Sequence, residues 1–172
     1  MARLRVGVLV SGFGSNLQTL IDLCADPEFP AEIVAVISNK PNVVALERAA
    51  KAGIRTSVIP HKSFPDRLTF DQAIDSALRA ADVQLVCLAG FMRILTPMFV
   101  ELWRDAVINI HPSLLPSFRG LDTHRQALEA EHQAYPLALR LIAERRVTVE
   151  GRRVRISGGT GPVAAALINP AS

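Results

Sequence analysis

Residues 5–24 read RVGVLVSGFGSNLQTLIDLC, and this stretch decides the fold class. Arg5–Val10 is a short apolar run rich in β-branched residues, which is typical of a buried strand. A turn with two glycines follows at once, and after it four apolar residues recur at the spacing of one helix face: Leu17, Leu20, Ile21 and Cys24. A strand, a tight turn and an amphipathic helix in this order predict the first βα unit of a parallel sheet.

The alternation of strand and helix continues along the chain as far as Ile110. Further strands are expected at Ile33–Ile37, Thr56–Ile59, Val83–Leu88 and Val107–Ile110. Helices are expected at Ser15–Cys24, Val43–Ala52, Asp66–Ala80 and Pro97–Leu102. The strands are almost continuously apolar, as expected when helices cover both faces of a sheet. The sequence therefore predicts an α/β fold with an open, mainly parallel, Rossmann-like sheet.

The pattern changes after Pro116. Thr123–Glu144 is predicted to be a helix that kinks or splits at Pro136, because a proline inside a helix removes a backbone hydrogen bond. Val147–Val149 and Arg153–Ile156 are predicted to pair as a short hairpin. The C-terminal part is therefore expected to be a helix and a hairpin.

Length and composition fit one folded domain. A chain of 172 residues that is 49% hydrophobic can build one core, so we expect a single domain over residues 1–156 and a flexible tail over residues 157–172. No apolar run approaches the roughly 18 residues of a membrane span, and no signal peptide is recognisable, so a cytoplasmic protein without a membrane partner is expected. Cys24 and Cys87 have no disulfide or metal-ligand pattern, which predicts reduced thiols and no metal site.

The net charge of +3 comes partly from a cluster of arginines near the C-terminus. The members of this cluster are Arg145, Arg146, Arg152, Arg153 and Arg155. Such a cluster could bind nucleic acid or could be the solvated surface of a hairpin. We favour the hairpin, and no nucleic-acid partner, because no aromatic side chains are interleaved for base stacking.

The turn after the first predicted strand is SGFGSN, residues 11–16. Glycines let the backbone approach an anion, and the N–H groups and dipole of a helix N-terminus favour negative charge. A dinucleotide fingerprint would need glycine at Leu17, so a single phosphate monoester is favoured over NAD and a nicotinamide-dependent oxidoreductase. Ser15 and Gln18 are expected to form a capping box. The alternative is a plain βα turn with Ser15 as N-cap.

A second polar motif, Asn109-Ile110-His111, ends the fifth predicted strand. Side chains alternate along a strand, so Asn109 and His111 are expected to point to the same side. The amide can donate a hydrogen bond to a carbonyl oxygen as charge develops, and the imidazole can act as a general acid. The alternative is that both side chains only stabilise their own turn. Their paired spacing at a carboxyl strand end favours a catalytic role.

Four segments together resemble glycinamide ribonucleotide formyltransferase: residues 11–16, Leu88–Leu95, Ile108–Pro116 and Gly120–His124. The similarity runs from residue 4 to residue 130 and resumes at Glu131–Pro136. Methionyl-tRNA formyltransferase and formyltetrahydrofolate deformylase are similar around the Asn-x-His motif. The tRNA enzyme usually has Arg-Gly-Ala-x-Pro where this chain continues from Arg119-Gly120 into Leu121-Asp122. The resemblance therefore favours a ribonucleotide over a tRNA partner.

The resemblance implies an enzyme that transfers a formyl group from 10-formyltetrahydrofolate, as co-substrate, to the amine of glycinamide ribonucleotide in de novo purine biosynthesis. The residues it implies for ribonucleotide binding are Gly14, Ser15, Asn16 and Glu131. Those it implies for the folate and its formyl group are Arg67, Met92, Arg93, Ile94, Leu95 and Asn109. Asn109 and His111 would stabilise the oxyanion of the tetrahedral intermediate, with His111 also the proton donor. No metal is implied, and we expect a monomer or a homodimer.

The chain departs from the family between Ala130 and Glu131, where relatives normally carry several dozen more residues with further strands and a catalytic aspartate. Loss of an acidic partner is expected to leave His111 more often neutral, which weakens proton transfer. Two hypotheses follow: an active folate-dependent formyltransferase, or a catalytically impaired binding variant of the same family. A true internal deletion predicts one helix that runs across Ala130 and Glu131, whereas an incomplete sequence predicts a break there.

Overall fold

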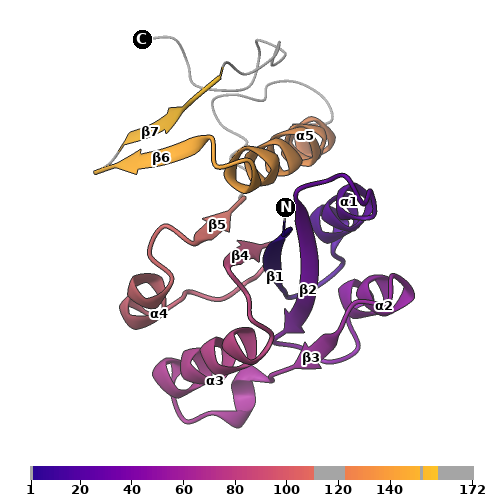
Figure 1. The fold of residues 1–172 in the computed structure, drawn as a ribbon. Helices are drawn as coiled ribbons and strands as arrows, with labels where there is room; N and C mark the ends of the chain where they lie inside the picture. Colours follow the sequence, from indigo (N-terminus) through magenta and orange to yellow (C-terminus); the bar gives the residue numbers. More distant parts are fainter. Residues whose placement is uncertain (1, 111–122, 152, 159–172) are drawn as a thin grey trace. The chain divides into compact units, whose positions relative to one another are not determined.

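The structure is a computed structural model that describes residues 2–110, 123–151 and 153–158 (Figure 1). The chain forms two compact units, Met1–Ile110 and His111–Ser172, and each is described by itself. The single domain expected over residues 1–156 stays a prediction.

A five-stranded parallel sheet forms the centre of the first unit. Its strands are β1 (Leu4–Val10), β2 (Ala31–Ser38), β3 (Thr56–Val58), β4 (Leu85–Leu88) and β5 (Val107–Asn109). The order across the sheet is β3-β2-β1-β4-β5, and every neighbouring pair is parallel. The predicted α/β class and the Rossmann-like sheet are therefore confirmed.

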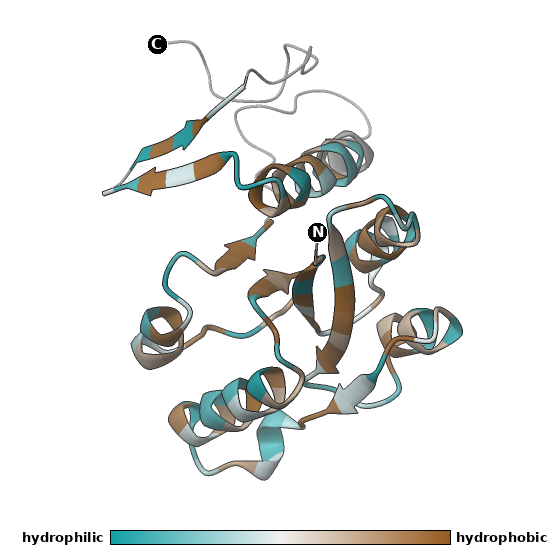
Figure 2. Cartoon of the chain, in the orientation of Figure 1, coloured by the Kyte–Doolittle hydropathy of each residue, from teal (hydrophilic) through white to brown (hydrophobic). Residues whose placement is uncertain are grey.

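Helices cover both faces of this sheet, with α1 and α2 on one side and α3 and α4 on the other (Figure 1). Their bounds are Ser15–Cys24 for α1, Val44–Lys51 for α2, Arg67–Ala80 for α3 and Pro97–Leu102 for α4, with a short 3-10 turn at His61–Ser63. Both ends of each of the four α-helices lie within one residue of their predicted positions. The strands carry mostly hydrophobic residues (Figure 2), because both of their faces are covered.

One part of the core lies between the sheet and helices α3 and α4. Its largest side chains are buried and come from both helices and the central strands: Leu9, Ile37, Val86, Phe70, Ile74, Leu78, Phe99 and Trp103. The rings of Phe99 and Trp103 are stacked, with their centroids 6.2 Å apart. Burial of these apolar groups fixes the strand order and leaves the carboxyl ends of β1 and β4 side by side, where such sheets bind ligands.

The capping box predicted for Ser15 and Gln18 is wrong. The N-cap of α1 is Gly14, in the left-handed region at φ +76°, and Ser15 is already the first helical residue. The Gln18 side chain instead donates to Asp22 and accepts from Arg48. The glycine turn determines where the helix starts, so the serine lies one position too late to cap it. By contrast, Asp66 caps α3 through the Thr69 N–H, as a side-chain cap should.

The second unit contains α5 (Thr123–Ala143) and a separate antiparallel hairpin of β6 (Val147–Glu150) and β7 (Arg153–Ile156). The hairpin was predicted, and its register pairs Val147 with Ile156 and Glu150 with Arg153. A kink or a split was expected at Pro136; the split is wrong, because α5 continues through this residue, and the kink stays a prediction.

Helix α5 also runs without interruption across Ala130 and Glu131, as expected for a chain in which the two flanks are joined directly. The absence of a family segment at this position stays a prediction. Of the expected tail, residues 159–172 lie outside the described residues. In the part of the chain that the structure describes, no helix combines the length and apolar character needed to cross a membrane.

Candidate functional site

A cavity of about 200 Å³ lies at the carboxyl ends of β1 and β4. Its wall is made by the turn after β1 and by the residues after β4: Ser11, Gly12, Phe13, Gly14, Ser15, Asn16, Ala89, Gly90 and Met92. The first turn of α1 borders the cavity, and helix N-termini present N–H groups and a positive dipole end. This arrangement can hold a phosphate group.

Gly14 can only be glycine in this turn. Its φ of +76° is one that side chains rarely adopt, and a Cβ there would lie 2.7 Å from the Cβ and 2.9 Å from the Cα of Ala45. Ala45 is fully buried in α2, and its N–H donates to the Gly12 carbonyl over 3.1 Å. The N-terminal turn of α2 therefore packs directly against the glycine turn and sets its shape.

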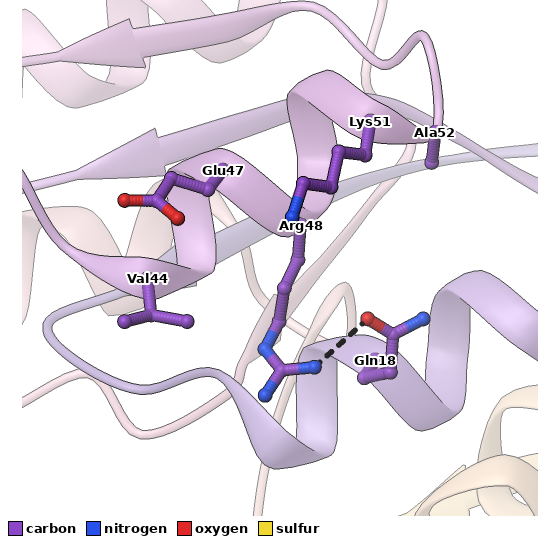
Figure 3. Close-up of a pocket in the computed structure, with 6 residues that line it drawn as sticks. All are labelled: Gln18, Val44, Glu47, Arg48, Lys51 and Ala52. Atoms are coloured by element: carbon purple, nitrogen blue, oxygen red, sulfur yellow. Dashed lines mark hydrogen bonds between the residues drawn. The ribbon is translucent and has the colours of Figure 1, made fainter.

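Arg48 of α2 also holds the glycine turn. Its Nε donates to the Phe13 carbonyl over 3.1 Å, and its guanidinium carbon lies 4.6 Å from the centre of the Phe13 ring. A second guanidinium nitrogen donates to the Gln18 side chain over 3.0 Å (Figure 3). Arg48 and Gln18 border a surface depression of about 440 Å³ between α1 and α2. The guanidinium thus connects both helices to the turn and adds positive charge beside it.

The segment after β4 presents apolar side chains to the surface. Met92 is 70% exposed and Ile94 is 75% exposed, which is unusual for residues of this type. The segment is held at both ends: the Met92 N–H donates to the Ser11 hydroxyl over 2.8 Å, and the Thr96 N–H donates to buried Asp71 over 2.6 Å. An exposed apolar segment anchored in this way suits a flat apolar ligand.

The formyl transferase family profile matches residues 4–135. The chain belongs to this family. It is 51% identical over 140 residues to the trifunctional purine biosynthetic protein adenosine-3 of Homo sapiens, and this alignment covers 81% of the chain and 14% of that protein. It is 40% identical over 141 residues to phosphoribosylglycinamide formyltransferase of Escherichia coli, and this alignment covers 82% of the chain and 66% of that enzyme. The chain therefore spans less than two thirds of the length of these curated relatives.

Solved structures of formyl transferases agree with the fold. Glycinamide ribonucleotide transformylase 1 from Symbiobacterium toebii superposes with a TM-score of 0.83 and 35% identity, covering 90% of this chain and 94% of that one. Phosphoribosylglycinamide formyltransferase from Coxiella burnetii superposes with a TM-score of 0.77 and 33% identity, covering 90% of this chain and 93% of that one. The predicted family resemblance is confirmed.

The structure brings some of the predicted site residues together. Gly14, Ser15, Asn16 and Met92 line the same cavity. Asn109 is the last residue of β5, where it pairs with Leu88 of β4, and its side chain is exposed. His111 lies outside the described residues, so its predicted alignment with Asn109 stays a prediction.

Two other predicted residues lie on helices. Arg67 is the first residue of α3 and directly follows the N-cap residue Asp66. The pKa of Asp66 is lowered mainly by the hydrogen bond from the Thr69 N–H and also by that from the Thr69 hydroxyl. Glu131 is a buried residue of α5 in the second unit. Its role in ribose binding stays a prediction.

The sequence-based predictions missed four residues that shape the candidate site: Ser11, Asn39, Arg48 and Asp71. Ser11 was inside the quoted turn, but nothing in the pattern indicated that its hydroxyl makes long-range contacts. The other three lie 25 or more positions from the residues they contact, so local spacing carried no signal.

The Nδ1 atom of His61 lies 3.1 Å from the Asn39 carbonyl. Within the described ranges, no three His, Cys, Asp or Glu side chains are grouped so that they could hold a metal ion. Cys24 and Cys87 are both buried, and burial raises the pKa of Cys24 to about 11.

Proposed function

We propose that this chain transfers the formyl group of 10-formyltetrahydrofolate to the amine of glycinamide ribonucleotide, a step of de novo purine biosynthesis. The observation that carries the proposal is the cavity at the end of β1. There a glycine turn at a helix N-terminus, suited to a phosphate, lies beside the start of an exposed apolar segment, suited to a pterin ring. The names of the relatives support glycinamide ribonucleotide as the acceptor of the formyl group.

In this proposal the phosphate of the ribonucleotide binds at Gly14, Ser15 and Asn16. Glycine at residue 14 allows the left-handed backbone of the turn, and the N–H groups of the first turn of α1 can then donate to the phosphate oxygens. The Glu131 carboxylate accepts hydrogen bonds from the ribose hydroxyl groups.

The folate binds along Met92, Arg93, Ile94 and Leu95, where the exposed side chains of Met92 and Ile94 cover its flat ring system. Arg67 lies at the start of α3 and carries a positive charge suited to a folate carboxylate or to the formyl-bearing end. The formyl donor is a co-substrate, and the proposed chemistry uses no metal.

The reaction is acyl transfer through a tetrahedral intermediate. The amine nitrogen attacks the formyl carbon, and Asn109 donates a hydrogen bond to the oxygen as negative charge develops on it. His111 gives a proton to the folate nitrogen as its bond to the formyl carbon breaks, and the proton released by the attacking amine restores the histidine. The net change is one C–N bond formed and one broken, with a proton moved from the amine to the folate.

The experiment that tests this function is an assay of formyl transfer from 10-formyltetrahydrofolate to glycinamide ribonucleotide with the purified chain. We expect turnover, and we expect His111→Ala to lower kcat by about 10²- to 10⁴-fold while glycinamide ribonucleotide still binds. A chain that binds neither substrate contradicts the proposal.

A second candidate is a catalytically impaired variant that binds the same ligands. It is motivated by the resemblance, which implies that a family aspartate is missing between Ala130 and Glu131. Binding of both substrates without turnover above background favours this candidate, whereas turnover that His111→Ala abolishes excludes it.

The substrates of this proposal are small, water-soluble metabolites, so we infer a cytoplasmic protein without nucleic-acid or membrane partners. We expect a monomer or a homodimer. Sedimentation equilibrium at two ionic strengths distinguishes these states, and a larger assembly contradicts the inference.

A further inference from the structure

Ser11 joins three neighbouring strand ends through one buried hydroxyl group. Its Oγ donates to Oδ1 of Asn39, which follows β2, over 2.6 Å. The same Oγ accepts from the backbone N–H of Met92, which follows β4, over 2.8 Å. Ser11 itself follows β1, so the hydroxyl connects the ends of β2, β1 and β4.

Asn39 is the acceptor of the Ser11 proton. Its side-chain oxygen faces Ser11, and its side-chain nitrogen lies on the His61 side, 3.2 Å from Nδ1 of that ring. A hydroxyl has one proton, so a proton given to Asn39 leaves only lone pairs for Met92, and these are what an N–H group needs. Both side chains are nearly inaccessible, Ser11 at 4% exposure and Asn39 at 2%, so water does not replace either partner readily.

The two ends of this connection belong to the two proposed substrate sites. Ser11 opens the glycine turn that surrounds the proposed phosphate position, and Met92 begins the proposed folate segment. Both residues line the same cavity. If the segment that begins at Met92 shifts and its hydrogen bond breaks, the buried Ser11 hydroxyl loses one of its two partners and holds the glycine turn less firmly. A shift of the glycine turn would weaken the position of the Met92 segment in the same way.

We propose that Ser11 is a positioning residue that couples the two substrate sites. Its hydroxyl holds the Met92 segment and the glycine turn in one arrangement, so that ligand binding at either site favours binding at the other. The inference rests on the proposed function, because it takes the phosphate and the folate to be the two ligands. Coupling of this kind is reciprocal, so each ligand must change the affinity for the other by the same factor.

The test uses glycinamide ribonucleotide and tetrahydrofolate, which lacks the formyl group and therefore allows both sites to be filled without turnover. Titration calorimetry measures the Kd of each ligand with and without the other. For the unaltered chain we expect each ligand to tighten the binding of the other by about fivefold. In Ser11→Ala we expect this factor to fall to about one, because the connecting hydroxyl is gone.

Ser38→Ala is the matched control. Ser38 is fully buried at the end of β2, but its hydroxyl donates to the Lys40 carbonyl within its own turn and reaches neither substrate site. We expect this variant to keep the full coupling factor. Ser11→Thr keeps the hydroxyl that Ser11→Ala lacks, so we expect it to retain most of the coupling. If residue 11 only had to be small, the larger threonine would instead lower the coupling more than alanine does.

Hydrogen exchange at the Met92 amide gives a second readout that needs only inorganic phosphate. We expect phosphate to slow this exchange in the unaltered chain and to have no such effect in Ser11→Ala. Should Ser11→Ala fail to fold, Asn39→Ala removes the acceptor that orients the hydroxyl and is expected to reduce the coupling in the same direction.

The two failures are distinguishable. Binding of both ligands with a coupling factor that is the same in the unaltered chain and in Ser11→Ala overturns the inference and leaves the proposed function standing. Failure of the unaltered chain to bind either ligand overturns the proposed function and the coupling with it.

Discussion

The carboxyl ends of β1 and β5 both carry polar residues of the proposed site, but they are built in different ways. Strand β1 has a parallel neighbour on each side, and its turn is enclosed by Ala45 and Arg48 of α2. Strand β5 is three residues long and, in the part of the chain that the structure describes, is the last strand of the sheet. Asn109 at its end is exposed.

This difference separates binding from chemistry. The glycine turn takes its shape from Ala45 and Arg48, which lie in the same unit. The proposed oxyanion pair combines Asn109 with His111, which belongs to the segment after that unit. We therefore expect substitutions at the β1 end to change phosphate affinity and stability, and substitutions at the β5 end to change turnover alone.

The largest effect is expected from Gly14→Ala. The new Cβ would overlap Ala45, and the residue would keep a strained positive φ, so we expect a loss of about 2–5 kcal/mol in the free energy of unfolding and loss of phosphate binding. Chemical denaturation and phosphate titration measure both. Gly12→Ala is the control, because a Cβ at Gly12 has nothing within 4 Å, and it is expected to change stability by about 1 kcal/mol or less. Equal losses of unfolding free energy in Gly14→Ala and Gly12→Ala would contradict the close packing of Ala45 against the turn.

Asn109→Leu tests the other end of the comparison. The change keeps the size of the side chain but removes the amide donor, so we expect kcat to fall by about 10²- to 10³-fold with little change in the Kd of glycinamide ribonucleotide. Steady-state kinetics and a binding titration separate the two quantities. Gln72→Leu, an exposed amide on α3, is the control and is expected to keep normal turnover. A fall in affinity that matches the fall in kcat would show that binding and chemistry are not separated in this way.

A smaller effect is expected from Arg48→Met. The change removes the donor to the Phe13 carbonyl and a positive charge beside the turn, so we expect phosphate affinity to weaken by about tenfold and tetrahydrofolate affinity to stay unchanged. Arg79→Met is the matched control, because Arg79 also lies over an aromatic ring, at 5.2 Å from Trp103, but away from the turn. If both variants bind phosphate equally well, Arg48 has no part in shaping the site.

Local patterns in the sequence determined the order and type of the elements of the first unit. The apolar runs, the helical stripe of α1 and the turn glycines act between residues close in sequence, and their spacing is sufficient to predict a parallel α/β sheet. The Asn109-Ile110-His111 motif and the glycine turn were recognised for the same reason, since each lies within a single strand end.

Only the tertiary structure decided how those motifs are held. Gly14 rather than Ser15 caps α1 because Ala45, 31 positions later, packs against the turn, and Ser11 meets Met92 across 81 positions because β1 and β4 are neighbours in the sheet. Strand order brings such residues together through the burial of apolar faces. Contacts of this kind leave no local period in the sequence, so the residues that position the site become visible only when the chain is folded.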